Sequence, residues 1–137
     1  MISSFKNEYG FLSNFYPVEI SYEGLSFLSV EAAFQACKTL DKAQRLIFTN
    51  LTPRDAKLKG RAIFLREDWE EVKDGIMYDL CKLKFTENED LKKQLLETGN
   101  RVLIEGNHHG DRYWGVVDGV GKNRLGKILM MIREEIK

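Results

Sequence analysis

Several features are absent from this chain of 137 residues, and each absence excludes a class of protein. Its longest apolar runs are far shorter than the roughly 20 residues that a membrane-spanning helix needs. The N-terminal segment MISSFKNEYG has neither the basic start nor the apolar stretch of a secretory signal peptide, so we expect a cytoplasmic protein. No internal repeat or linker-like segment interrupts the chain, and its length suits one domain, residues 1–137.

Patterns typical of metal sites and disulfides are also missing. The chain has 2 cysteines and 2 histidines, and it contains neither CxxC nor HExxH. Cys37 and Cys81 lie in helical patterns rich in apolar residues, so we expect buried free thiols rather than a disulfide. His108 and His109 are adjacent and point in different directions, which favours a surface position over a metal site. We therefore expect no metal.

An excess of positive charge is the third absence. The chain has 21 basic and 21 acidic residues, whereas proteins that bind nucleic acid nonspecifically usually carry a basic excess. Neutrality fits a small ligand or a single modified nucleotide better than a long duplex. The remaining composition, 43% apolar and 31% charged, is typical of a soluble globular protein.

Helical periodicity with a few short strands predicts an α+β fold that is mainly helical. We expect two short strands within 17–28 around a turn at Glu23-Gly24, and another strand over 101–105. Periodicity and capping residues predict helices over 31–38 after Ser29, from Asp41 to about Asn50, from Thr52-Pro53 to about Lys59, over 68–86, over about 89–97 before Gly99, and over 123–136. The glycine-rich segment 106–126 is too long for a simple turn, and such loops are often functional.

The segment SVEAAFQACK, residues 29–38, combines two stripes on one predicted helix. At about 100° per residue, one apolar stripe consists of Val30, Ala33, Phe34, Cys37 and Leu40. Glu31, Gln35 and Lys38 form a second stripe, roughly a third of a turn away. Either this stripe is solvated and holds a helical ion pair, or a cleft covers it. In the second case Glu31 is a general base or an electrostatic stabiliser, and Lys38 is an anion anchor or a nucleophile.

Two further segments near the start of the chain carry candidate binding groups. GFLSNFYP, residues 10–17, is either a packed N-terminal arm or a lip on which a planar base stacks. In the second interpretation Asn14 offers both a donor and an acceptor to a sugar or base edge. Lys57, Arg61 and Arg66 form either a solvated basic face or a clamp for a phosphate or pyrophosphate.

The loop 106–126 holds polar and aromatic side chains among six glycines. Its candidate residues are Asn107, Asp111, Trp114 and Asn123. Glycines allow a close approach to a ligand, but they also simply make loops. The end of the loop, GVGKNRLG, precedes a predicted helix whose N-terminal amides would attract an anion, although its spacing matches no established phosphate-binding loop.

The order of the motifs is more specific than any one of them. FLSNFYP, SVEAAFQACK, KGRAIFLREDWEEVKDGIMYDLCKLKF, LLETG, LIEGN, GDRYWG and GKNRLGKILM follow one another over nearly the whole chain. This set resembles the NADAR family of YbiA-like proteins. The resemblance implies a compact, mainly helical YbiA-like domain and cleavage of an N-glycosidic bond at the anomeric carbon of a ribose.

The resemblance also implies two substrate classes and no cofactor. One class is the ribosylamino-pyrimidine intermediates of the early riboflavin pathway, which carry a 5-phosphate. The other is ADP-ribose attached to guanine, in a nucleotide or in modified DNA, and the family name reflects a link to NAD and ADP-ribose metabolism. No membrane partner is expected, and the identity of any protein partner is unknown from the sequence.

Position within the motifs implies the roles of individual residues. The resemblance places Glu31, Lys38 and Asp111 at catalytic positions. It places seven residues at substrate-binding positions: Asn14, Phe15, Arg61, Trp69, Trp114, Gly115 and Asn123. Trp69 suits core packing equally well, because it begins an amphipathic helical stripe. Asp111 suits a turn equally well, because it lies between Gly110 and Arg112.

Cleavage of a ribosyl C–N bond builds positive charge on C1′ and the ring oxygen, which a neighbouring carboxylate stabilises. Glu31 is the candidate carboxylate. A charged Lys38 would hold a phosphate or a ring hydroxyl, whereas a neutral Lys38 would form a Schiff base with the ring-opened aldehyde. The second role needs a pKa well below about 10.4. The alternatives are a non-catalytic module that binds ADP-ribose or NAD derivatives, and a helical interaction domain whose 106–126 loop contacts a protein.

Overall fold

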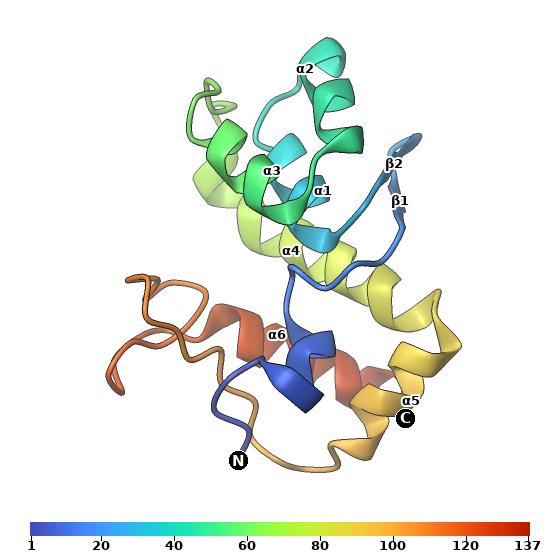
Figure 1. Ribbon diagram of the computed structural model, residues 1–137, viewed down its shortest axis with the longest axis vertical. Helices are drawn as coiled ribbons and strands as arrows, with labels where there is room; N and C mark the ends of the chain where they lie inside the picture. Colours follow the sequence, from blue (N-terminus) through green and yellow to red (C-terminus); the bar gives the residue numbers. More distant parts are fainter. The chain divides into compact units, whose positions relative to one another are not determined.

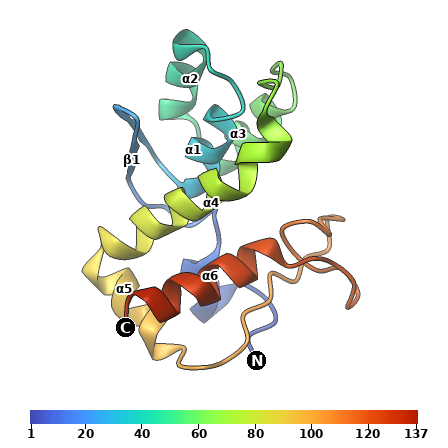
Figure 2. The same cartoon turned by 180° about the vertical axis from the view of Figure 1, so that it is seen from behind.

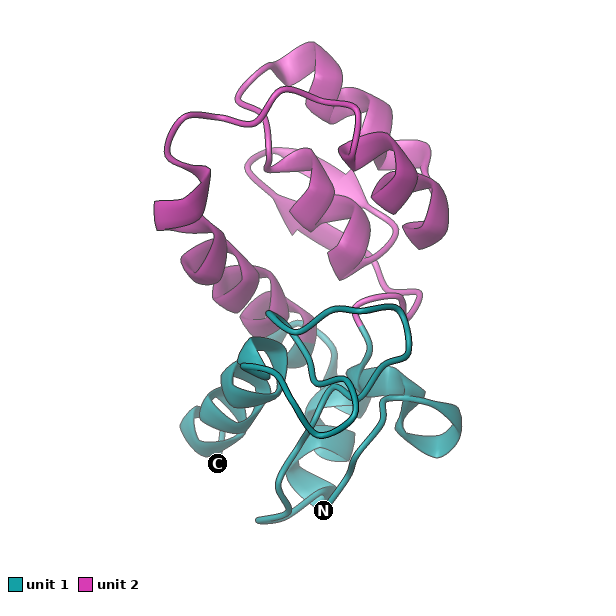
Figure 3. Cartoon of the chain, turned by 90° about the vertical axis from the view of Figure 1, so that its left-hand side faces the viewer, with its two compact units in different colours: residues 1–13, 85–137 teal, residues 14–84 magenta.

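The computed structural model describes all residues, 1–137, and they form two compact units. Figure 3 shows unit 2, residues 14–84, in magenta and unit 1, residues 1–13 and 85–137, in teal. The secondary structure is mainly helical with one two-stranded sheet, as predicted for an α+β chain (Figure 1). None of the helices is both long enough and apolar enough to cross a membrane.

Unit 2 begins with an antiparallel hairpin of strands β1 (Ile20–Tyr22) and β2 (Leu25–Phe27). Ile20 pairs with Phe27, and both side chains are buried. Glu23 and Gly24 form the turn with positive φ angles of 48° and 85°. Such angles are typical of tight hairpin turns, so the predicted pair of strands and its turn are confirmed.

The helices of unit 2 begin at the predicted capping residues. The Ser29 hydroxyl accepts from the Ala32 amide at 3.1 Å and caps α1 (Val30–Ala36). The Asp41 carboxylate caps α2 (Lys42–Ile47), which continues as the 3-10 helix η2 (Phe48–Asn50). The Thr52 hydroxyl accepts from Asp55 and caps α3 (Pro53–Gly60), which Pro53 starts. The longest helix, α4, runs over Trp69–Thr86.

Helix α1 lies at the centre of unit 2, and all of its residues are buried. Helix α3 packs against it, as Figures 1 and 2 show from opposite sides. The predicted apolar stripe is confirmed from Val30 to Cys37, whose side chains are buried, but the prediction is wrong for Leu40. The helix ends at Ala36, so Leu40 lies beyond it and is 65% exposed.

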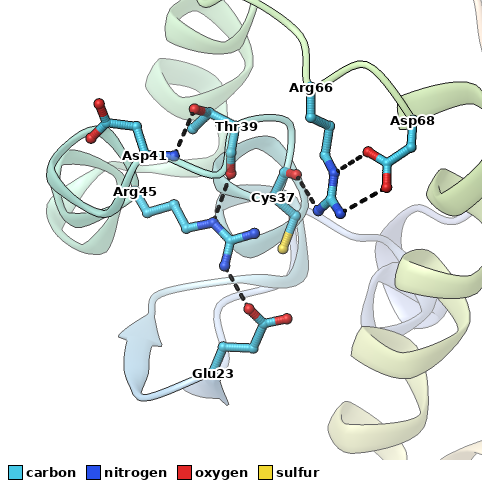
Figure 4. A network of polar contacts seen from close by, with 7 residues as sticks. All are labelled: Glu23, Cys37, Thr39, Asp41, Arg45, Arg66 and Asp68. Carbon is cyan, nitrogen blue, oxygen red and sulfur yellow. Dashed lines mark hydrogen bonds and ion pairs between the residues drawn. The ribbon is translucent and has the colours of Figure 1, made fainter.

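Arginine side chains hold the segment that follows α1 (Figure 4). Arg45 of α2 donates from Nε to the carbonyl of Thr39 at 2.8 Å and from Nη1 to the Glu23 carboxylate at 2.7 Å. Arg45 is 8% exposed, so the guanidinium ties the hairpin turn to the end of α1 from a buried position. These two contacts of Arg45 therefore hold the chain in place where it leaves α1.

Unit 1 contains the 3-10 helix η1 (Asn7–Leu12), α5 (Glu89–Glu97) and α6 (Arg124–Glu135). Helix α5 ends before Gly99, which has a φ of 66°, as expected for a glycine just after a helix. The Phe11 ring meets the Phe85 ring edge-on at 6.5 Å. The buried face of α6 includes Leu125, Leu129 and Ile132, which confirms the predicted C-terminal helix.

The predicted strand over 101–105 is wrong. This segment makes one parallel bridge, in which the Ile2 amide donates to Val102 and the Ile104 amide donates to Ile2, both at 2.8 Å. The N-terminal segment turns into η1 soon afterwards, so no partner strand continues the ladder. Leu103 is fully buried, which accounts for the apolar pattern without a strand.

Both cysteines are buried free thiols, as predicted. Burial raises the pKa of the Cys37 thiol to about 11 and that of the Cys81 thiol to about 12. The reactive thiolate is therefore scarce at neutral pH at both positions.

Candidate functional site

Glu31 and Gln35 form a buried polar pair on α1. Their side chains are one helical turn apart, and Gln35 Nε2 donates to Glu31 Oε2 at 2.6 Å. Glu31 is 9% exposed and Gln35 is 6% exposed, so the interpretation of a solvated stripe is wrong for both. The Glu31 amide donates to the Asn14 carbonyl at 3.0 Å, which ties the start of α1 to the segment before the hairpin.

Gln35 has a second neighbour that the sequence does not indicate. Its Oε1 is buried and has no hydrogen-bond partner. A Cβ atom on Gly60, at the end of α3, would lie 1.9 Å from this oxygen. The close packing of α3 on α1 therefore depends on a glycine opposite Gln35, and helical periodicity carries no signal for a contact between two helices.

Lys38 lies two residues beyond α1 and is half-buried. Burial lowers the pKa of its amine, the charge of Glu31 raises it, and the cations Arg61, Lys57 and Lys73 lower it further. The direction of the net shift is the one that a Schiff-base lysine requires. The neighbouring cations equally suit an anchor for an anion.

The three basic residues near the end of α3 do not act alike. Arg66 donates from Nε and Nη2 to the two carboxylate oxygens of Asp68 at 2.6 and 3.1 Å, and from Nη1 to the Cys37 carbonyl at 3.5 Å (Figure 4). Its amide also donates to the Lys38 carbonyl at 2.8 Å. Arg66 therefore braces the end of α1, and only Lys57 and Arg61 of this trio remain as candidates for a phosphate clamp.

The predicted lip, residues 10–17, contains one buried amide and two exposed rings. Asn14 is 9% exposed, and its Nδ2 contacts Met77 Sδ at 3.4 Å while its Oδ1 accepts from Cys81 Sγ at 3.8 Å. Phe15 is 41% exposed, with Lys57 Nζ 5.9 Å from its ring centroid. Exposed rings next to cations suit stacking of a planar base, whereas Asn14 holds the segment against α4.

Trp69 begins α4 and is buried, with its ring centroid 5.0 Å from that of Phe34 on α1. These contacts favour core packing over a role in a pocket wall. Asn14 and Trp69 thus both contribute to the interior of unit 2.

The remaining candidates lie in unit 1, where the loop 106–126 is held by its own side chains. Asp111 Oδ1 accepts from the amides of Tyr113 and Trp114 at 3.0 and 2.9 Å. Asn107 Oδ1 accepts from the Asp111 amide at 3.1 Å, and Asn107 Nδ2 donates to the Asp111 carbonyl at 2.9 Å. These contacts match the interpretation of Asp111 as a turn-forming residue.

Asn123 and Gly115 also have clear structural surroundings. Asn123 Oδ1 accepts from the Glu105 amide and its Nδ2 donates to the Leu103 carbonyl, both at 2.9 Å, so both ends of this amide hold main chain. A Cβ on Gly115 would clash with the Glu105 carboxylate oxygen Oε2 and with the Glu105 carbonyl oxygen, so this packing requires glycine. Trp114 is half-buried and meets Tyr113 edge-on at 4.9 Å. Direct contact of these residues with a substrate stays a prediction.

The idea that GVGKNRLG cradles an anion is wrong. The amides of Lys122, Asn123, Arg124 and Leu125 donate to the carbonyls of residues 112–115 at 2.8–3.2 Å. The first amides of α6 are therefore occupied by protein carbonyls. His108 and His109 are both exposed, as predicted.

Comparison with known proteins gives one consistent answer. Residues 3–137 match the NADAR domain. N-glycosidase YbiA of Escherichia coli (strain K12) is 36% identical over 137 residues, which cover 97% of this chain and 85% of that protein. N-glycosidase Npun_R5314 of Nostoc punctiforme is 38% identical over 136 residues, which cover 94% of this chain and 86% of that protein.

A larger relative is riboflavin biosynthesis protein VVA0006 of Vibrio vulnificus, which is 39% identical over 135 residues. The match covers 94% of this chain but spans only about a third, 36%, of the Vibrio protein. The NMR structure of E. coli YbiA superimposes with a TM-score of 0.87 over 98% of this chain and 82% of that chain, at 36% identity. The fold is thus that of YbiA, as the motif order predicts, and the chain belongs to the NADAR domain family.

Proposed function

We propose that this protein is an N-glycoside hydrolase that cleaves the C1′–N bond between a ribosyl group and a base. Glu31 acts as the catalytic carboxylate. The names of the YbiA and Nostoc relatives support the activity class. The observation that carries the residue assignment is the Glu31 carboxylate, which is 9% exposed, receives a 2.6 Å hydrogen bond from Gln35 and acts electrostatically on Lys38.

In the proposed reaction the C1′–N bond breaks and its electron pair leaves with the base nitrogen, which takes a proton from solvent. Positive charge develops on C1′ and the ring oxygen, where the Glu31 carboxylate stabilises it. A water oxygen then bonds to C1′ and gives its proton to Glu31, which returns it to solvent. Water is the only co-reactant, so the reaction needs no cofactor.

The charges around Lys38 support an anionic substrate. Four cations, Lys38, Lys57, Arg61 and Lys73, interact electrostatically within unit 2, with Glu31 as the carboxylate among them. A substrate phosphate would relieve the mutual repulsion of these cations. Lys57 and Arg61 are therefore our candidates for the phosphate contact, and the exposed Phe15 ring is our candidate for base stacking.

Two substrate classes remain candidates. Phosphoribosylamino-pyrimidine intermediates are favoured by the Vibrio relative and by an Arabidopsis thaliana relative, 41% identical over 96 residues, both named riboflavin biosynthesis proteins. The second class is ADP-ribosyl-guanine in a nucleotide or in DNA. We also propose that residues 1–137 act as one functional domain, because the NADAR match covers nearly all of them.

Substrate class and activity are tested together by mass spectrometry of released products. Purified protein and its Glu31→Gln variant are incubated with each substrate class. We expect release of ribose 5-phosphate or of ADP-ribose by the unchanged protein only. Bound ligand without release from either substrate would instead support the alternative, a non-catalytic module that binds ADP-ribose or NAD derivatives.

The role of Lys38 is tested by Lys38→Arg and by borohydride. An anchor needs only a positive charge, so the variant would keep activity. A Schiff base needs a primary amine that attacks the ring-opened aldehyde and releases water, so the variant would be inactive. Borohydride added during turnover would then trap a covalent adduct on Lys38.

A further inference from the structure

Two arginines of unit 1 meet at Thr98, the residue that caps the end of α5. Arg133, in the last turn of α6, donates from Nη1 to the Thr98 hydroxyl at 2.9 Å. Arg101 donates from Nε to the Thr98 carbonyl at 3.1 Å and from Nη1 to the Tyr9 hydroxyl at 2.9 Å. Segments far apart in the sequence thus come together here, and Figures 1 and 2 both show the end of α6 beside α5.

Arg133 carries a buried charge that has no counterion. The residue is 6% exposed, and its one side-chain hydrogen bond goes to a neutral hydroxyl group. Burial lowers the pKa of its guanidinium, the charge of Glu134 raises it, and the charge of Arg101 lowers it further. The Glu134 side chain is 64% exposed and already pairs with Lys137. Because buried charges are normally paired, this guanidinium lacks the negative group that would compensate it.

Most hydrogen-bond donors at this position are unused and open to solvent. A guanidinium has five N–H groups, of which Arg133 uses one and Arg101 uses two. The Tyr9 hydroxyl accepts from Arg101, so its own hydrogen stays available. Arg101 is exposed and Tyr9 is half-buried. The unbonded nitrogens of Arg133 are accessible as well, because Gln35 Oε1 is the only fully buried side-chain nitrogen or oxygen without a partner.

We infer that Arg101, Arg133 and the Tyr9 hydroxyl form a binding site for the phosphate group of a small-molecule ligand. All three offer donors, and two of them are cations. Guanidinium groups match the geometry of phosphate oxygens, and a phosphate monoester brings about −1.5 to −2 charges at neutral pH, enough to compensate both cations. The site consists of residues of unit 1 alone, so it goes beyond the proposed hydrolase reaction of Glu31 and is tested independently of it.

A purely structural role of the two arginines would behave differently. Cations at the end of a helix interact favourably with its last carbonyls, and both arginines contact the residue that caps α5. If this is their whole role, their replacement changes stability, and phosphate does not bind to them. If they form a phosphate site, phosphate binding is saturable and depends on the exposed Arg101.

Titration with inorganic phosphate, followed residue by residue by NMR, tests the inference. The amides of Thr98 and Arg101 and the Nε–H signals of both arginines report on this site, whereas signals from unit 2 report separately on the cations around Lys38. Arg101→Met removes the exposed cation, and Arg133→Lys keeps the buried charge but removes the planar guanidinium. Lys93→Met is the matched control, because Lys93 is an exposed cation on α5 that forms no ion pair.

We expect saturable shifts of the Thr98 and arginine signals in the unchanged protein and in Lys93→Met. Binding should be roughly tenfold weaker or more in Arg101→Met, as for the loss of hydrogen bonds between charged groups. Arg133→Lys should also bind more weakly, because an ammonium group does not replace a bidentate guanidinium. Equal affinities in Arg101→Met and Lys93→Met, or no saturable shift in the unchanged protein, would overturn the inference. An equal response to acetate would overturn the assignment to phosphate.

Discussion

Replacing Trp69 with alanine separates its two interpretations. The indole is 5% exposed and packs on Phe34 at a centroid distance of 5.0 Å, so the substitution leaves a cavity between α4 and α1. Large aromatic residues in a core cost about 3–5 kcal/mol when they are cut back to alanine. We therefore expect a loss of roughly 4 kcal/mol in the free energy of unfolding.

This loss translates into a melting temperature. At about 2.1 cal/mol/K per residue, unfolding of 137 residues carries an entropy of roughly 0.29 kcal/mol/K. A loss of about 4 kcal/mol then lowers the melting temperature by roughly 14 °C. Denaturant titration and thermal scans measure both quantities, and Trp69→Phe serves as a control that keeps an aromatic ring.

Activity decides what the stability loss means. With Trp69 in the core, the folded fraction of Trp69→Ala should keep its KM. A loss below about 1 kcal/mol together with a strongly raised KM would refute core packing and make Trp69 part of the substrate pocket.

Two further predictions concern stability. The Asp41 carboxylate caps α2 by accepting hydrogen bonds from the amides of Ala43 and Gln44. Asp41→Ala should therefore lower the free energy of unfolding, measured in denaturant titrations, by about 1 kcal/mol, and an unchanged value would contradict the capping role. Burial lowers the pKa of Lys84 to about 7, so the unfolded chain, with its ordinary lysine, binds the extra proton between about pH 7 and 10.5. The contribution of Lys84 to stability should therefore rise with pH across this window. Between about pH 7 and 9, below the range in which the buried thiols titrate, stability should depend less steeply on pH in Lys84→Met, whereas equal slopes in both proteins would refute the shifted pKa.

Elements set by local chemistry could be predicted from the sequence. Ser29, Asp41 and Thr52 start helices because their side-chain oxygens accept hydrogen bonds from amides of the first turn, whatever lies further away. Pro53 suits the first position of α3 because it has no amide proton to satisfy and its φ is already helical. The turn at Glu23-Gly24 likewise depends on residues next to one another. The motif order then predicted the family fold that the YbiA structure confirms.

Elements that depend on a distant partner could not be predicted in this way. The segment 101–105 has a strand-like pattern but no continuing partner strand. Periodicity placed Glu31 and Gln35 on one face, but only the packing of α3 decides that this face is buried and that Gly60 lies against it. The sequence groups Arg66 with Lys57 and Arg61 as basic residues. Its ion pair with Asp68 depends on the conformation of the loop before α4, which the sequence pattern does not indicate.

The central claim is that Glu31 carries the chemistry, and a comparison of rate and affinity in one variant tests it most directly. Glu31→Gln keeps the size of the side chain but removes the negative charge that stabilises C1′. The single-turnover rate and the ligand affinity are measured for the unchanged protein, for Glu31→Gln and for Glu67→Gln, an exposed control in the same unit. We predict a rate loss of roughly a hundredfold or more for Glu31→Gln alone, with affinity nearly unchanged. Equal rates in the Glu31→Gln and Glu67→Gln proteins would contradict the claim.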